Sequence, residues 1–125
     1  MWRTFMSKPV VLAIDDTVSA LKYYNEALSE QYSVSCAKSG AIALRYLENH
    51  IPDIILLDWH MPEMSGKDTI AEIKKIYPEV PVIIISGDPN IVVDRKKIGA
   101  ADIADKSIKP EQLCFLISRY LNCGI

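Results

Sequence analysis

The segment from Asp53 to Gly66 constrains the fold of this chain more than any other stretch. Its residues 54–57 form an apolar run without polar alternation, which is typical of a parallel strand covered by helices on both faces. The run stops at Asp58, and Pro62 and Ser65-Gly66 then predict a loop before the next helix. Because open α/β sheets bind ligands at the carboxyl ends of their strands, we expect Asp58 at the rim of a crevice.

Strand and helix patterns alternate five times along the chain. Apolar or β-rich runs predict strands at residues 10–14, 32–37, 54–57, 82–85 and around 103–104. Helical spacing of apolar residues predicts helices after Thr17, Gly40, Gly66 and Pro110, and a weaker pattern suggests a short helix over 89–98. This alternation predicts a doubly wound α/β fold, with a five-stranded parallel sheet and helices on both faces.

Two of these helices allow detailed expectations. Thr17 or Asp16 is expected to cap the first helix through a side-chain oxygen. The buried faces are expected to comprise Val18, Leu21, Tyr24 and Leu28 in that helix, and Ile70, Ile73, Ile76 and Tyr77 in the helix after Gly66.

Composition restricts the class of protein. The chain has 125 residues, which suits one domain, and we expect a single domain over 8–125 after a disordered extension over 1–7. Half of the residues are apolar and the net charge is −2, so the chain is neither disordered nor a typical nucleic-acid binder. No apolar run has the length of a membrane span. Because Cys36, Cys114 and Cys123 have no zinc-ligand spacing, we interpret them as thiols in a reducing cytoplasm.

Polar side chains follow four of the predicted strands, at the residues Asp15-Asp16, Asp58, Ser86 and Lys106. Parallel strands place these groups at one edge of the sheet. Three carboxylates repel one another unless a cation intervenes, and Mg²⁺ is the hard, oxygen-liganded ion that we expect there.

This set of groups suits phosphoryl transfer. A carboxylate in such a site can attack phosphorus to give an aspartyl phosphate, while the metal, Lys106 and the Ser86 hydroxyl hold the phosphoryl oxygens. The sequence contains no glycine-rich phosphate loop or nucleotide fingerprint. The phosphoryl donor is therefore expected to be a partner protein or a small phosphorylated molecule.

The chain resembles the receiver domains of response regulators in two-component signalling over about residues 8–121. The resemblance rests on Val-Val-Leu-Ala-Ile-Asp-Asp at 10–16, the segment 55–66, Val-Ile-Ile-Ile-Ser-Gly at 82–87, and Gly99-Ala100 followed by Lys106. It implies a flavodoxin-like sheet with strand order 2-1-3-4-5. It also implies a signalling module that catalyses its own phosphorylation and dephosphorylation and is no enzyme in the ordinary sense.

The resemblance further assigns roles to the site residues. Asp58 would accept phosphate from a histidine kinase or phosphotransfer protein. Asp15, Asp16, Asp58 and the backbone carbonyl of His60 would hold Mg²⁺, and Ser86 and Lys106 would respond to the phosphoryl group. The output would be an altered binding surface for an output domain or partner protein, with homodimers possible and with no nucleic acid or membrane bound by this chain itself.

Four features depart from the usual receiver pattern. Ser107 follows Lys106 where proline is common, and this tail resembles receivers that precede a helix-turn-helix DNA-binding domain. Ile103 replaces the usual switch aromatic, so a ring-based rotamer switch coupled to Ser86 is not expected. The segment from Ser86 to Gly99 is slightly shorter than is usual in receiver domains, and His60 stands where asparagine is more usual.

Two other functions compete with a phosphorylated receiver. A degenerate receiver would act as a constitutive interaction domain, but the complete set of polar residues argues against this. A small aspartate-nucleophile phosphatase would usually carry an Asp-x-Asp pattern at its first strand, which Asp15-Asp16 does not form.

Two lysines compete for the site, and the sequence favours Lys106 over Lys109. Lys106 directly follows the fifth strand, whereas Lys109 precedes a proline suited to the first turn of the last helix. We therefore predict that Lys106→Ala impairs the phosphorylation-linked conformational change and that Lys109→Ala leaves it nearly intact. Amide hydrogen exchange with and without a phosphoryl analogue measures this change. An equal response of both variants would contradict the assignment.

Overall fold

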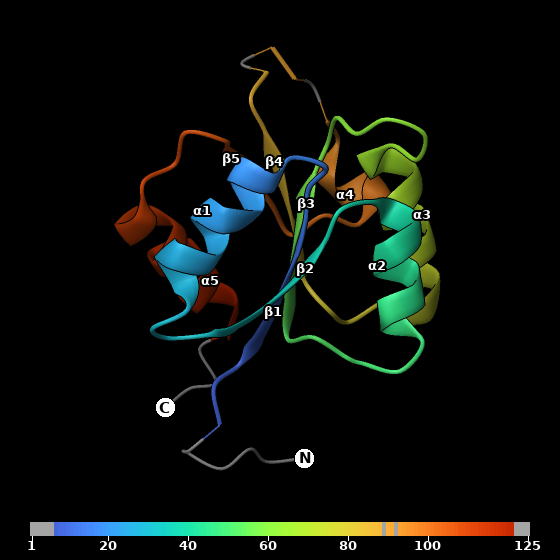
Figure 1. Cartoon of the computed structure of the whole chain (residues 1–125). Helices are drawn as coiled ribbons and strands as arrows, with labels where there is room; N and C mark the ends of the chain where they lie inside the picture. Colours follow the sequence, from blue (N-terminus) through green and yellow to red (C-terminus); the bar gives the residue numbers. More distant parts are fainter. Residues whose placement is uncertain (1–6, 89, 92, 122–125) are drawn as a thin grey trace.

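The computed structural model describes residues 7–88, 90–91 and 93–121, so the predicted extension over 1–7 lies almost wholly outside it. Strands and helices alternate through the described chain (Figure 1). They are β1 (Val10–Ile14), α1 (Val18–Leu28), β2 (Ser33–Ala37), α2 (Gly40–Leu47), β3 (Ile54–Asp58), α3 (Gly66–Ile76), β4 (Val82–Ser86), α4 (Arg95–Ile98), β5 (Asp102–Asp105) and α5 (Pro110–Leu121).

The five strands form one parallel sheet in the order β2-β1-β3-β4-β5, which confirms the predicted architecture. β3 is the central strand, with β1 on one side and β4 on the other. Leu57 is in register with Ile14 of β1, and Asp58 is in register with Ile85 of β4. The end of β3 therefore lies between the ends of its two neighbours.

Helices cover both faces of the sheet. Figure 1 shows α1 and α5 on one face and α2, α3 and α4 on the other. β3 is buried along its whole length and alternates its side chains between two apolar clusters, with Ile54 and Leu56 in one and Ile55 and Leu57 in the other. The continuous apolar run of the sequence thus reflects burial on two faces and not one.

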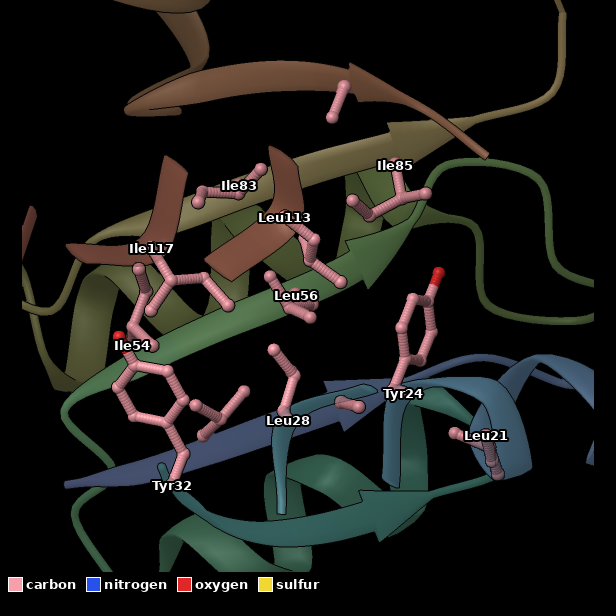
Figure 2. Packing of buried hydrophobic residues seen from close by; sticks show 13 residues of the cluster. Leu21, Tyr24, Leu28, Tyr32, Ile54, Leu56, Ile83, Ile85, Leu113 and Ile117 are labelled. Carbon is pink, nitrogen blue, oxygen red and sulfur yellow. The ribbon is translucent and has the colours of Figure 1, made fainter. Parts of the chain in front are cut away.

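The first cluster joins α1 and α5 to the sheet. Figure 2 shows Leu28 of α1 and Leu113 and Ile117 of α5 packed against Leu56, with Tyr24 nearer the carboxyl end of the strands. Each fully buried Leu or Ile side chain contributes about 1.5–3 kcal/mol of transfer free energy. This face is therefore fixed mainly by apolar packing.

The buried faces of the helices correct two predictions. Val18 is 64% exposed and Ile76 is 45% exposed, whereas Leu21, Tyr24, Leu28, Ile70 and Ile73 are buried as predicted. At 3.6 residues per turn, each step of three residues falls about 60° short of a full turn. A row of apolar residues spaced by three therefore turns gradually around the helix axis, away from the sheet. Val18 and Ile76 lie at the ends of such rows, where the side chains face solvent.

The first two helices differ in their N-terminal caps. Ser39 caps α2 by accepting a hydrogen bond from the amide of Ile42 at 3.1 Å. Thr17 occupies the N-cap position of α1, but its side chain makes no cap hydrogen bond. The expected capping by Thr17 or Asp16 is therefore wrong, because the Thr17 hydroxyl has another partner, described below.

α4 is shorter than predicted. The described residues of 90–94 are not helical, and Pro89 and Val92 lie outside the described chain. α4 begins at Arg95 because Asp94 is extended and its side chain accepts a hydrogen bond from the amide of Lys97 at 3.3 Å. It ends at Ile98, and the following residue, Gly99, has a φ of 83°, which suits glycine.

Two further expectations concern features away from the sheet. In the described part of the chain, no helix combines the length and the apolar character needed to cross a bilayer. Cys36 is exposed and Cys114 is half-buried, and both are free thiols. Cys123 lies outside the described residues.

The contact between α2 and α3 requires a residue without a side chain at Gly40. A Cβ atom there would overlap the Thr69 hydroxyl and lie 2.9 Å from the Met64 sulfur. Thr69 is fully buried and its hydroxyl donates to the Ser65 carbonyl at 2.8 Å, so it cannot easily yield.

We predict that Gly40→Ala lowers the free energy of unfolding by about 1–3 kcal/mol, the usual effect of overpacking. Helix propensity alone would predict the opposite sign. Urea unfolding measures the difference. Gly87→Ala is the matched control, because the nearest atom to its added Cβ lies at an ordinary 3.8 Å. Equal stability of Gly40→Ala and the wild type would refute the overlap.

Candidate functional site

The carboxyl ends of four strands bring the predicted polar residues to one edge of the sheet. Asp58 and Ser86 are the last residues of β3 and β4, while Asp15 and Lys106 directly follow β1 and β5. Asp15, Asp58 and Ser86 are buried, and Asp16 is exposed. Parallel pairing alone accounts for this assembly, since it aligns all strand ends in one direction.

Three carboxylates form the centre of the site. Asp15, Asp16 and Asp58 each offer one oxygen, and these three oxygens lie within 4.8 Å of one another. Two of the carboxylates are almost inaccessible to water, with exposures of 0% for Asp15 and 3% for Asp58. Such a cluster concentrates negative charge where solvent screens it poorly.

Thr17 holds the Asp15 carboxylate in place. Oδ1 of Asp15 accepts hydrogen bonds from the backbone amide and from the hydroxyl of Thr17, both at 2.9 Å. This role differs from the helix cap that we expected of Thr17. The available signal was the spacing Asp-x-Thr, since an aspartate side chain commonly accepts from the amide two residues later.

The other oxygen of Asp15 lacks a hydrogen bond. Oδ2 is fully buried and accepts no well-directed hydrogen bond from the described residues. The Lys106 Nζ atom lies 3.0 Å away, so the contact is an ion pair without good hydrogen-bond direction. A buried carboxylate oxygen in this condition can take another cationic ligand.

Lys106 spans the two buried carboxylates. Its Nζ atom lies 3.2 Å from Oδ2 of Asp58 as well as 3.0 Å from Oδ2 of Asp15, which confirms the predicted contact with Asp58. Burial would lower the pKa of Lys106, but the close contact with the Asp15 carboxylate and its charge, followed by the charge of Asp58, hold that pKa above its ordinary value. The ammonium therefore stays charged and partly offsets the carboxylates.

Lys109 lies outside the site. It is exposed, and its backbone amide donates to the Gln112 side chain at 3.4 Å across the first turn of α5. The position of this helix entrance is the one predicted from Pro110.

A turn after β5 fixes the backbone of Lys106. Oδ1 of Asp105 accepts from the amide of Ser107 at 2.8 Å and from its hydroxyl at 2.6 Å, which also lowers the pKa of Asp105. The amide of Lys106 donates to the Ser86 carbonyl at 2.9 Å. The Lys106–Ser107 peptide is trans, as expected without proline. Ser107 thus constrains this turn through hydrogen bonds, where a proline would constrain it through its ring.

Both oxygens of the Asp58 carboxylate accept hydrogen bonds. Its Oδ1 accepts from the backbone amide of His60 at 3.3 Å, and its Oδ2 accepts from Lys106. Burial and the charge of Asp15 raise the pKa of Asp58, and Lys106 opposes this shift. A divalent cation would favour the ionised form in the same way that Lys106 does.

The loop after Asp58 is packed closely against the start of α3. The amide of Gly66 donates to the Trp59 carbonyl at 3.1 Å, and a Cβ at Gly66 would lie 2.7 Å from the Asp58 carbonyl oxygen. Residue 66 must therefore be glycine for α3 to start this close to β3. The His60 side chain is exposed, and its carbonyl as a metal ligand stays a prediction.

Ser86 is 2% exposed at the end of β4. Its hydroxyl oxygen accepts from the amide of Asp88 at 3.1 Å, and the residue is in register with Asp105 of β5. Ser86 is thus connected to the segment before α4 through its side chain and to Lys106 through its carbonyl.

The donor set fits a hard divalent cation. All of its ligand atoms are oxygens, two carboxylates are buried, and Oδ2 of Asp15 lacks a hydrogen bond. Magnesium binds through one or a few carboxylates and retains water, which the exposed Asp16 side permits. In the described residues, no other group of three acidic, histidine or cysteine side chains meets at this spacing.

Comparison with known families and proteins supports the resemblance. Residues 11–118 match the family model described as the response regulator receiver domain. A probable cyclic di-GMP phosphodiesterase of Vibrio cholerae is 32% identical over 118 residues, covering 91% of this chain and 26% of that protein. The transcriptional regulatory protein GlrR of Escherichia coli is 42% identical over 82 residues, covering 65% of this chain and 18% of that protein.

Solved structures agree in fold. The receiver domain of NtrX from Brucella abortus has a TM-score of 0.84 at 30% identity, covering 91% of this chain and 99% of that chain. A CheY-like receiver domain protein from Methanospirillum hungatei has a TM-score of 0.86 at 24% identity, covering 93% and 95%. The chain spans about a quarter of the length of the curated relatives that it matches first.

We predict that magnesium alters the fluorescence of Trp59, because this residue directly follows Asp58 in the chain and its side chain is half-buried. Titration of a Trp2→Phe variant isolates this signal, since the chain has two tryptophans. The change is expected at millimolar magnesium, to reverse with EDTA, and to weaken strongly in Asp15→Asn. Emission that stays flat, or a response that Asp15→Asn preserves, would argue against the metal site.

Proposed function

The chain belongs to the response regulator receiver domain family, and from this membership we propose that Asp58 accepts a phosphoryl group from a phosphohistidine of a partner protein. The observation that carries the proposal is the contact of one ammonium, Lys106, with two buried carboxylates. The donor is a histidine kinase or a histidine phosphotransfer protein. The chain acts as a signalling module of a two-component system, and its aspartyl phosphate is the signal.

The reaction is a single displacement at phosphorus. An oxygen of the ionised Asp58 carboxylate forms a bond to phosphorus, while the bond from phosphorus to the imidazole nitrogen breaks. The electron pair of that bond returns to the imidazole, which takes a proton from solvent. Hydrolysis of the acyl phosphate by water then releases inorganic phosphate and restores the carboxylate.

Asp15, Asp16, Asp58 and the backbone carbonyl of His60 would hold Mg²⁺ in this proposal. When bound, the ion supplies positive charge that neutralises the developing charge on the phosphoryl oxygens. Thr17 keeps the Asp15 carboxylate oriented toward the site through two hydrogen bonds.

Lys106 and Ser86 would respond to the phosphoryl group. Lys106 now contacts Oδ2 of Asp58, and its stem is long enough to follow negative charge onto a phosphoryl oxygen. The Ser86 hydroxyl would exchange its hydrogen bond from Asp88 for one that it donates to the phosphoryl group. This exchange would move the segment between β4 and α4 and so change a surface distant from Asp58.

The output is a change of binding surface for an output domain or a partner protein. The curated relatives include regulatory proteins such as LuxO of Vibrio campbellii, of which the matching segment is a small part. This chain spans only about a quarter of the length of such proteins.

Intact mass spectrometry after incubation with magnesium and acetyl phosphate tests the proposal. We expect the wild type to gain the mass of one phosphoryl group and Asp58→Asn to gain none. Omission of magnesium should remove most of the modification. Lys109→Ala alters an exposed lysine outside the site, so as a control it should gain the same mass as the wild type.

Two outcomes would favour the competing functions. A wild type that gains no mass with either acetyl phosphate or a phosphorylated histidine phosphotransfer protein would indicate a constitutive interaction domain. Sustained turnover of p-nitrophenyl phosphate that depends on Asp58 would indicate a phosphatase.

A further inference from the structure

A pocket of about 560 Å³ lies between α3 and α4, on the side of the sheet opposite α1 and α5. Its apolar lining consists of Trp59, Ile70, Ala71, Val93 and Ile98. At 1.5 Å per residue, α4 is only about 6 Å long, whereas α3 extends about 16 Å. The short α4 leaves much of this side of α3 without a helical neighbour, and the pocket occupies that space.

The rim of the pocket is strongly cationic. Lys67 and Lys74 of α3 and Lys97 of α4 line it, and Asp94 is the one carboxylate among the described lining residues. The Asp94 side chain already accepts a hydrogen bond from the backbone amide of Lys97, as the N-cap of α4. The pocket therefore carries three positive charges against one negative charge, in a chain whose net charge is −2.

Two of the three lysines are available to a ligand. Lys74 is committed, because its Nζ atom donates to the Val80 carbonyl at 2.6 Å and to the Pro78 carbonyl at 3.3 Å. Lys67 and Lys97 are exposed on opposite walls, and neither makes an ion pair within the described part of the chain. A ligand acid group would meet both ammonium groups without displacing an internal partner.

Lys74 also joins the two walls. Its aliphatic stem packs against Gly99 at the end of α4, where a Cβ would lie 3.3 Å from the Lys74 Cγ atom. This contact and the two carbonyl bonds link α3 to the chain that follows α4 and to the loop before β4. The pocket thus lies beside a fixed contact between its two walls.

We propose that this pocket binds a small organic anion with an apolar body and one acid group, which is a carboxylate, a sulfonate or a phosphate ester. Its volume lies in the range of small-ligand pockets, and an apolar lining with a few charged groups is typical of them. The apolar body would lie against Trp59, Ile70 and Ile98, and the acid group would lie between Lys67 and Lys97. The proposal is independent of phosphorylation at Asp58.

A pair of matched probes tests the site on the full, unphosphorylated chain. The first is 8-anilinonaphthalene-1-sulfonate, and the second is N-phenyl-1-naphthylamine, which has the same rings without the acid group. Binding is followed by energy transfer from Trp59 in the Trp2→Phe variant, because Trp59 lines the pocket. We expect the sulfonate to bind at least about fivefold more tightly than the neutral amine, as about 1 kcal/mol of charge interaction allows.

Substitutions locate the binding. Ala71 is exposed and lines the pocket, so Ala71→Phe fills it without disturbing the core, and binding of the sulfonate should become at least about tenfold weaker. Ala41→Phe is its control, on the exposed face of α2. A double variant with Lys67→Gln and Lys97→Gln should bind the sulfonate no more tightly than the neutral amine. Lys22→Gln and Lys38→Gln is the control pair, which removes the same charge from exposed positions elsewhere.

Three results would overturn the proposal. The first is equal binding of the two probes to the wild type. The second is sulfonate binding that the lysine pair or Ala71→Phe leaves unchanged, since the exposed lysines can be replaced without risk to folding. The third is binding of an acidic peptide rich in leucine, sensitive to the same substitutions, when the sulfonate does not bind. That result would make the pocket a protein-docking surface.

Discussion

Two buried carboxylates beside one ammonium set the electrostatic balance of the site at the edge of the sheet. Removing a charged group from water costs several kcal/mol even after relaxation, and two like charges add repulsion to that cost. Asp15 and Asp58 bear both penalties, and Lys106 offsets them only in part. The site is therefore held by its surroundings, through the Thr17 hydrogen bonds to Asp15 and the His60 amide that donates to Asp58.

Each strand end that enters the site also leads to a different part of the surface. β3 leads through Trp59 to the pocket between α3 and α4, and β4 leads through Ser86 and Asp88 to the segment before α4. β5 leads through Lys106 to the turn of Asp105 and Ser107. The strand ends around Asp58 thus continue directly into segments that reach several surfaces.

Some features of this structure were predictable from sequence patterns, and others were not. The strand at 54–58 and the polar strand ends were predictable, because full burial leaves an apolar run and parallel pairing aligns the ends that follow. Val18 and Ile76 were misjudged, because spacing by threes indicates a helix without fixing how far its buried face extends. Thr17 was assigned to the wrong partner, because a hydroxyl beside an aspartate can cap a helix or bind that aspartate.

The fold class, the central strand and the five polar residues gathered at the edge of the sheet were predictable from the sequence, since they follow from burial patterns and from four strands that end on polar groups. The sequence also favoured Lys106 over Lys109, because only the former directly follows a strand. Only the folded chain shows which atoms meet: the shared contact of Lys106 with both aspartates, the Asp15 oxygen without a hydrogen bond, and the pocket beside the short α4. These depend on distances between segments far apart in the chain, and local periodicity carries no information about such distances.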